Sequence, residues 1–141
     1  MGLVYLLDTN IISEPTKQTP NENVLQKLKQ HNSCYAISAI TWHELNYGVD
    51  RMPAGKRKSR LQQYLHVLEV SQLTILPYDK LAARWLATER NRLVSIGNTP
   101  AKEDSEIAAI AVTNKLILVT RNITDFEPIN ELITENWFIK N

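Results

Sequence analysis

Four acidic residues that are far apart in the sequence lie beside segments expected to form regular structure. Asp8 directly follows an apolar run, Glu44 and Asp104 lie in helical patterns, and Asp125 comes soon after another apolar run. If folding gathers these carboxylates, their repulsion is unfavourable unless some bind protons or a cation neutralises them. An all-oxygen ligand set selects Mg²⁺, or alternatively Mn²⁺, rather than zinc.

A cation held in this way suits the cleavage of a phosphodiester bond. The metal lowers the pKa of a bound water and so creates the attacking hydroxide. It also stabilises charge on the phosphoryl centre and on the leaving oxygen. The scheme requires no protein nucleophile, and a deprotonated Glu44 or Asp125 can orient the water or hold a second ion.

Each of these acids also has an ordinary structural interpretation. Asp8 can cap a helix that starts at Thr9, and Glu44 can be a solvated surface residue. Asp104 can interact favourably with the dipole at a helix N-terminus. Asp125, like the nearby Asn122, can belong to a polar turn.

Asp104 is the residue whose position most favours a functional role. Ile107, Ala108 and Ala111 follow it at intervals of three, four and seven, which places Asp104 on the buried face of its helix. Glu103 and Glu106 would serve the helix dipole equally well from more exposed faces. The small side chains also allow this helix to approach a sheet closely.

Alternating apolar runs and amphipathic segments predict an α/β fold with an open, mainly parallel sheet covered by helices. Ligands of such folds bind at the carboxyl ends of the strands, where Asp8 lies. The expected strands are residues 3–7, 34–38, 73–76 and 116–119, with residues 133–139 as a short edge strand. The expected helices are residues 21–31, 39–52, 56–70, 80–96 and 103–114.

Length and composition fit one compact domain spanning residues 1–141. A net charge of +1 argues neither for nor against a nucleic-acid partner. The single cysteine, Cys34, excludes an internal disulfide and a cysteine-rich zinc site. No apolar stretch is long enough for a membrane span, and the first apolar run is too short for a signal peptide, so we expect a cytoplasmic protein.

Basic residues that could contact nucleic acid are concentrated in one place. Lys56, Arg57, Lys58 and Arg60 form the densest cluster, just after Arg51. They can bind phosphates, or they can simply be the solvated start of a helix.

The segments that carry the acids resemble PIN-domain proteins, and in particular the VapC toxins of bacterial toxin–antitoxin pairs. Any one of these segments is a weak signal, but their shared order and spacing are specific. The resemblance covers essentially the whole chain, through residues 6–10, 37–48, 97–109, 118–126 and 135–137.

The resemblance implies a three-layer PIN-like fold with strand order near 3-2-1-4-5. It implies a magnesium-dependent endoribonuclease in which Asp8 and Asp104 are the principal metal ligands and Glu44 completes the acidic cluster. Either Asn122 or Asp125 would be the fourth member. Further candidate contacts to RNA flank these acids at Thr9, Asn10, Thr120 and Arg121.

The resemblance also implies homodimers and a cognate antitoxin, whose C-terminal segment would enter a groove within residues 39–70. The alternative for Leu61, Tyr64, Leu65 and Leu68 in that region is ordinary core. A second functional hypothesis is a non-catalytic PIN-like module that binds nucleic acid or a partner. A third is a related nuclease that acts on DNA or structured substrates, which the short chain disfavours. The intact set of Asp8, Glu44 and Asp104 favours the enzyme.

Overall fold

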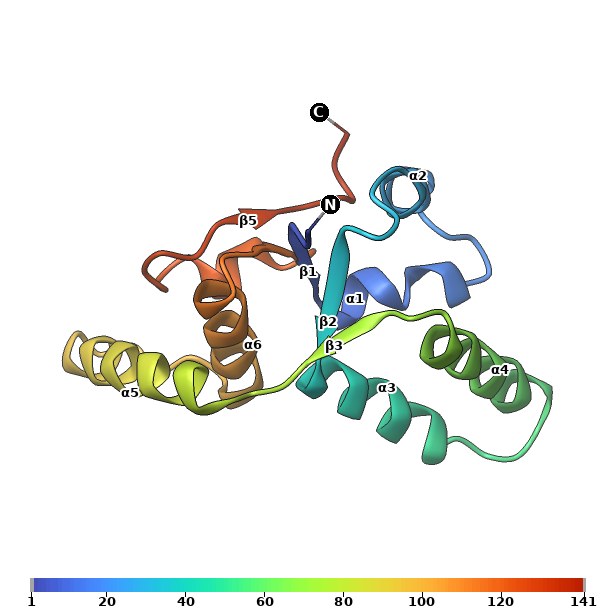
Figure 1. The fold of residues 1–141 in the computed structure, drawn as a ribbon. Coiled ribbons are helices and arrows are strands. Elements are labelled where there is room, and N and C mark those ends of the chain that lie inside the picture. Colours follow the sequence, from blue (N-terminus) through green and yellow to red (C-terminus); the bar gives the residue numbers. More distant parts are fainter. Residues whose placement is uncertain (1, 141) are drawn as a thin grey trace.

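Five short parallel strands form the centre of the molecule in the computed structural model, which describes residues 2–140 (Figure 1). Their order across the sheet is β3-β2-β1-β4-β5, so the predicted order is confirmed. The central strand β1 pairs with β2 on one side and β4 on the other. The strands are β1 (Tyr5–Leu7), β2 (Tyr35–Ser38), β3 (Thr74–Leu76), β4 (Ile117–Val119) and β5 (Thr134–Glu135).

The helices alternate with the strands along the chain, as the sequence pattern predicts. Five match the predicted segments with small shifts at their ends: α2 (Glu22–Gln30), α3 (Ala39–Asp50), α4 (Lys56–Val70), α5 (Lys80–Ser95) and α6 (Lys102–Thr113). The shorter elements are α1 (Thr9–Ile12) and the 3₁₀ turns η1 (Glu14–Thr16) and η2 (Ile123–Phe126). Among residues 2–140, none of the helices has the length and apolar character needed to cross a bilayer.

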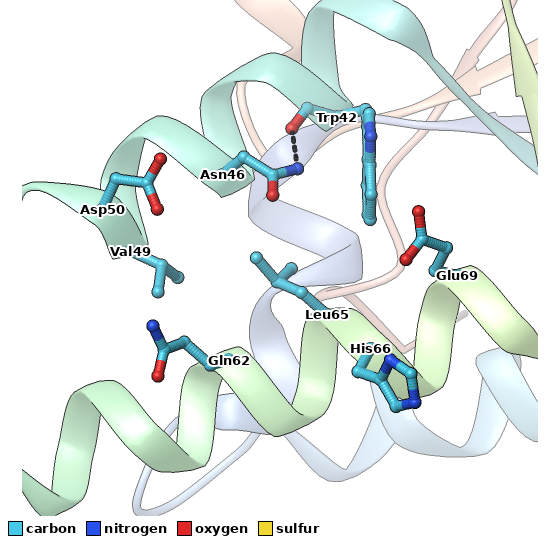
Figure 2. A pocket seen from close by; sticks show the side chains of 8 residues that line it. All are labelled: Trp42, Asn46, Val49, Asp50, Gln62, Leu65, His66 and Glu69. Atoms are coloured by element: carbon cyan, nitrogen blue, oxygen red, sulfur yellow. Dashed lines mark hydrogen bonds between the residues drawn. The ribbon is translucent and has the colours of Figure 1, made fainter.

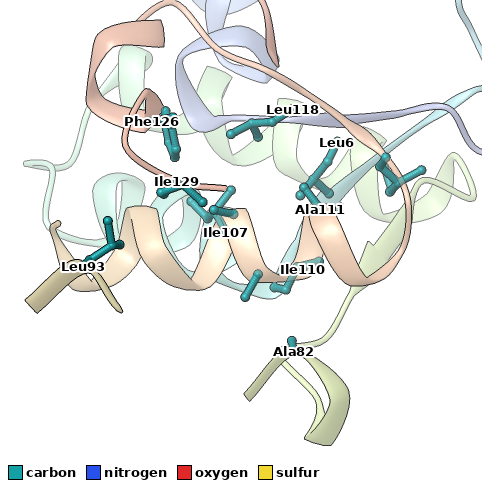
Figure 3. Packing of buried hydrophobic residues seen from close by; sticks show 13 residues of the cluster. Leu6, Ala82, Leu93, Ile107, Ile110, Ala111, Leu118, Phe126 and Ile129 are labelled. Carbon is teal, nitrogen blue, oxygen red and sulfur yellow. The ribbon is translucent and has the colours of Figure 1, made fainter. Parts of the chain in front are cut away.

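Two apolar cores cover the two faces of the sheet and make the predicted three layers. Successive residues of a strand point to opposite faces, so Leu6 belongs to one core and Leu7 to the other. The core around Leu6 joins the sheet to α5 and α6, and Figure 3 shows Ile107 and Ala111 of α6 close to Leu6. The core around Leu7 joins the sheet to α1, α2, α3 and α4.

Helix α6 is buried around most of its circumference by small and apolar side chains, between the sheet and α5. Ala108, Ala109 and Ala111 are fully buried, and Ile107 is nearly so. Small side chains let the helix lie close to the strands. Asp104, one turn before Ala108, is therefore held beside the edge of the sheet rather than out in solvent.

The apolar side chains of α4 belong mainly to the second core, so the core interpretation of Leu61, Tyr64, Leu65 and Leu68 is confirmed. Leu65 is buried, and the other three are partly buried against the same cluster. The Tyr64 hydroxyl also donates a hydrogen bond to the Ile12 carbonyl at 2.6 Å, which ties α4 to the end of α1.

The predicted edge strand within residues 133–139 is wrong in extent, because only Thr134 and Glu135 pair with β4. After Glu135, hydrogen bonds from side chains replace the pairing between strands. The Asn136 Oδ1 accepts a hydrogen bond from the Phe138 amide at 2.8 Å. The Asn23 side chain of α2 donates to the Trp137 carbonyl at 2.7 Å. These bonds turn the chain out of the sheet and bring it against α2.

Candidate active site

Asp8 lies at the carboxyl end of the central strand, as predicted. The β1–β4 register pairs Leu7 with Val119, and the Asp8 amide donates to the Val119 carbonyl at 2.9 Å. This register places Asp8 beside Thr120, which directly follows β4. The carboxyl ends of two neighbouring strands therefore meet at the acid.

The buried Asp8 carboxylate is held by three donors. Its Oδ1 accepts from the Thr9 amide at 2.8 Å, so Asp8 also caps α1. Its Oδ2 accepts from the Thr120 hydroxyl at 2.9 Å and from the Asn10 side chain at 3.4 Å. Burial raises the pKa of Asp8; the three donors oppose that rise, and the negative charge of Asp125 adds to it.

Glu44 reaches the same place from the second turn of α3. Ser38 is the last residue of β2, and its Oγ accepts from the Thr41 amide at 3.0 Å, so α3 begins where the strand ends. The Thr9 hydroxyl donates to Glu44 Oε1 at 3.0 Å and lies 3.3 Å from the Thr41 hydroxyl. Thr9 thus connects Glu44 to the residue next to Asp8.

Glu44 lies close enough to Asp8 and Glu103 for their charges to affect its pKa. Burial raises the pKa of Glu44, the Thr9 hydrogen bond opposes the rise, and the charges of Asp8 and Glu103 add to it. The His43 imidazole acts in the opposite direction and lowers the pKa.

Asp104 is the most strongly perturbed acid of the cluster. It is half-buried in the first turn of α6. Burial raises the pKa of Asp104 to about 6, helped by the charges of Asp8, Asp125 and Glu44. A charge has such an effect only at short range, so folding brings these four acids together.

The acid cluster meets the chemical requirements of a hard divalent cation, although its ligands are not preformed. Its donors are all carboxylate and hydroxyl oxygens. The ion pairs found among residues 2–140, Lys17–Glu14 and Arg92–Glu89, involve none of the cluster. No group of three or more His, Cys, Asp or Glu side chains in that range is already arranged to hold a metal. A divalent cation bound here would have to draw the carboxylates closer.

Asp125 and Asn122, the two candidates for the fourth member of the acid cluster, contribute different groups to it. Asp125, exposed on η2, acts electrostatically on both Asp8 and Asp104. Asn122 contributes its backbone, because its amide donates to the Thr120 hydroxyl at 3.1 Å. The effect of the Asp125 charge on Asp8 and Asp104 favours Asp125 as the fourth member of the cluster.

Three of the four candidate RNA contacts are occupied with positioning the site. Thr9 and Thr120 bind the acids as described, and the Asn10 Oδ1 accepts from the Arg121 amide at 3.1 Å. The exposed Arg121 guanidinium lies 4.5 Å from the centre of the Phe138 ring. Contact of these residues with RNA stays a prediction.

Thr41 and Glu103 also lie at the site, although the sequence did not predict them there. Thr41 is fully buried beside Thr9, and the exposed Glu103 adds its charge to those acting on Glu44 and Asp104. Thr41 was detectable in principle, because it lies three residues before Glu44 and therefore on the same face of the helix.

The fold agrees with comparisons to known proteins. Residues 5–130 match the PIN domain. The chain is 35% identical over 137 residues to ribonuclease VapC2 of Haemophilus influenzae, covering 96% of this chain and 98% of the relative. It is 35% identical over 138 residues to toxin FitB of Neisseria gonorrhoeae, covering 95% and 99%.

A solved structure of a related protein has a similar fold. The crystal structure of FitAcB from Neisseria gonorrhoeae superposes with a TM-score of 0.88 at 33% identity, covering 97% of this chain and all of the other. The chain therefore belongs to the PIN-domain family, and within that family to the group that contains the VapC proteins.

Neutralising Asp104 is expected to stabilise the metal-free protein. In Asp104→Asn, with EDTA at about pH 8, the free energy of unfolding should rise by about 1 kcal/mol, since a partly solvated carboxylate with a raised pKa costs stability when ionised. Urea denaturation measures the difference, with Glu106→Gln on the same helix as the control. A variant less stable than the wild type would contradict the electrostatic description of the site.

Proposed function

We propose that this chain is a magnesium-dependent endoribonuclease that acts in the cytoplasm as the toxin of a toxin–antitoxin pair. The observation that carries the proposal is the cluster of Asp8, Glu44, Asp104 and Asp125, whose charges act on one another at the carboxyl edge of the sheet. Relatives named ribonuclease and toxin, similar over nearly the full chain, support it.

In this proposal Asp8, Asp104 and Glu44 hold Mg²⁺, with Mn²⁺ as the alternative. When bound, the cation would lower the pKa of a water and stabilise charge at the scissile phosphate. The chain's own contribution is to position the acids. Thr120 and Asn10 fix Asp8, and Thr9 fixes Glu44.

Asp125 has a different task in the proposal, because it is the exposed member of the cluster. An exposed carboxylate can accept a hydrogen bond from the attacking water and orient it toward the phosphate. Asn122 is uncharged and lies three residues before Asp125. The hydrogen bond from its backbone amide to the Thr120 hydroxyl helps to fix the turn that carries Asp125.

The rival hypothesis is a PIN-like module that binds RNA or a partner without cutting. Burying several carboxylates that repel one another costs free energy, and a module that only binds has no use for them. Phosphates are moreover repelled by uncompensated acids. The gathering of these four acids therefore favours hydrolysis over binding alone.

Asp8→Asn is expected to abolish RNA cleavage while preserving the fold. Asparagine keeps the size and capping ability of the residue but removes the charge that a cation requires. A matched control is Asp79→Asn, because Asp79 also caps a helix, accepting from the Ala82 amide at 3.0 Å, and lies at the start of α5. Cleavage is measured by gel with the purified proteins, Mg²⁺ and total RNA.

The outcomes of this comparison separate the hypotheses. Loss of at least about a hundredfold in rate for Asp8→Asn, with Asp79→Asn near wild type, supports the enzyme. Equal cleavage by Asp8→Asn and the wild type contradicts the metal assignment. RNA binding without cleavage by every protein supports the binding module.

The antitoxin is proposed to occupy a groove of about 300 Å³ between α3 and α4 (Figure 2). Trp42, Val49 and Leu65 give it an apolar floor, and Asp50 and Glu69 give it an acidic rim. This combination suits an apolar peptide segment that carries basic side chains. The α3 residues that line the groove lie on the side of the helix away from Glu44, so an occupant of the groove would reach the acids only by continuing beyond it.

The homodimer belongs to the same proposal. Leu81, Val94 and Ile96 are 69%, 53% and 62% exposed on and just after α5. Apolar side chains in this position gain free energy if a second copy covers them. We infer that α5 takes part in the homodimer contact.

Expression of the wild-type chain alone is expected to arrest bacterial growth, and co-expression of the neighbouring antitoxin gene should restore it. Asp8→Asn should be harmless, which ties arrest to the acid cluster. Growth curves after induction measure the effect. A harmless wild-type chain that still cleaves RNA in the test tube would contradict the toxin role and leave the nuclease intact.

A further inference from the structure

A row of three side chains lies along the outward face of α3. The rings of His43 and Tyr47 are parallel, with an interplanar angle of 3° and centroids 6.1 Å apart. The Arg51 guanidinium lies 5.4 Å from the centre of the Tyr47 ring. With 3.6 residues per turn, residues 43, 47 and 51 follow one another along one face of the helix. We call these residues the α3 row.

The α3 row is not part of either apolar core. Tyr47 is 59% exposed, and His43 and Arg51 are also exposed. The buried face of the same helix is formed by Thr41, Leu45 and Val49. Exposed aromatic and cationic groups that stack on one another form a flat platform with a positive end.

The α3 row starts at the acid cluster. His43 is adjacent to Glu44 in the chain, and its imidazole acts on the Glu44 carboxyl. Tyr47 lies one turn beyond Glu44, at a spacing that makes them neighbours on the helix surface. A polymer bound along this row would therefore pass close to Glu44 of the acid cluster.

Gly48 adds an independent observation. It lies inside α3, where glycine weakens a helix, one turn after Glu44 and next to Tyr47. A Cβ built at Gly48 meets nothing within 4 Å, so packing within this chain does not explain the missing side chain. Its absence leaves the backbone beside Glu44 and Tyr47 open to close approach from outside.

These features match the chemistry of unpaired RNA. A nucleobase can stack on a tyrosine or histidine ring only when it is free of a duplex. A guanidinium binds phosphate oxygens, and it does so most strongly through paired hydrogen bonds. Beyond Arg51, the exposed Lys56, Arg57 and Arg60 continue the positive charge into α4.

We propose that His43, Tyr47 and Arg51 form a subsite that binds the unpaired nucleotides next to the bond that is cut. A base stacks on the Tyr47 ring, Arg51 binds a phosphate, and Gly48 gives the strand room against the helix. This inference rests on the proposed nuclease function, because it assigns the substrate strand to that same site.

The binding test uses the full chain with Asp8→Asn, which keeps the RNA intact during the measurement. The probe is a fluorescein-labelled oligouridylate of about twelve nucleotides, within the range of lengths that single-strand sites cover. Fluorescence anisotropy in magnesium buffer gives the Kd for this background and for the same background carrying Tyr47→Ala, Tyr47→Phe or Arg51→Gln. Val70→Ala is the matched control, because Val70 is an exposed apolar residue at the end of α4.

Tyr47→Ala should weaken binding about tenfold, as expected for the loss of one stacked base, whereas Tyr47→Phe should stay within about twofold. Arg51→Gln should weaken binding and flatten its salt dependence. Val70→Ala should have no effect. Annealing the probe to its complement should remove the difference between Tyr47→Ala and the background. With Asp8 restored, Tyr47→Ala should raise KM more than it lowers kcat.

Two results would overturn the subsite. One is an unchanged Kd and KM for Tyr47→Ala when the protein with Asp8 cleaves RNA. The other is dissociation of an oligomer by Tyr47→Ala, seen by analytical ultracentrifugation, with unchanged RNA affinity, which would make the α3 row a protein contact. If the variants lose RNA binding but no protein with Asp8 cleaves, the subsite stands and the nuclease proposal fails.

Discussion

Carboxylates in this protein are gathered where water cannot fully solvate them, and the rest of the structure can be understood from that constraint. The parallel pairing of β1 with β4 puts Asp8 beside Thr120. The alanines of α6 let Asp104 approach the same edge, and the immediate start of α3 after β2 brings in Glu44. Three separate parts of the chain thus deliver negative charge to one place.

Hydroxyl groups, rather than basic side chains, hold the acids in position. Thr120 donates to Asp8, and Thr9 donates to Glu44. A lysine or arginine in these positions would neutralise the acids and compete with a cation. Neutral donors fix their geometry without cancelling their charge, and burial together with the remaining repulsion raises the pKa of Asp104.

Helix α3 connects the three functions that we assign to the molecule. Its second turn carries Glu44, one flank faces the groove shared with α4, and the α3 row occupies the outward side. A peptide in the groove and a nucleic acid on the row would therefore occupy different sides of the same helix.

The sequence predicted the strands and helices well because each follows from a local pattern. Apolar runs marked β1 to β4, and 3.6-residue periodicity marked α2 to α6. The strand order came from the resemblance, since no local pattern encodes which strands are neighbours. The extent of β5 was wrong because the bonds that end it come from Asn136 and from Asn23, more than a hundred residues away.

The acids of the site were predicted from their places next to these elements, but their supports were not. The bond between Thr9 and Glu44 joins residues 35 positions apart, so no sequence spacing indicates it. The α3 row was also missed, although residues 43, 47 and 51 are four apart within the predicted helix; the stacking of the rings and the place of Arg51 over Tyr47 are visible only in the structure.

The most direct test of the central claim is calorimetric titration of Mg²⁺ into the metal-free wild type, Asp8→Asn and Asp79→Asn. We expect saturable binding of Mg²⁺ to the wild type and to Asp79→Asn, and loss of that binding in Asp8→Asn. Binding of equal affinity by all three proteins, or no binding to the wild type, would contradict the claim that the gathered carboxylates form a cation site.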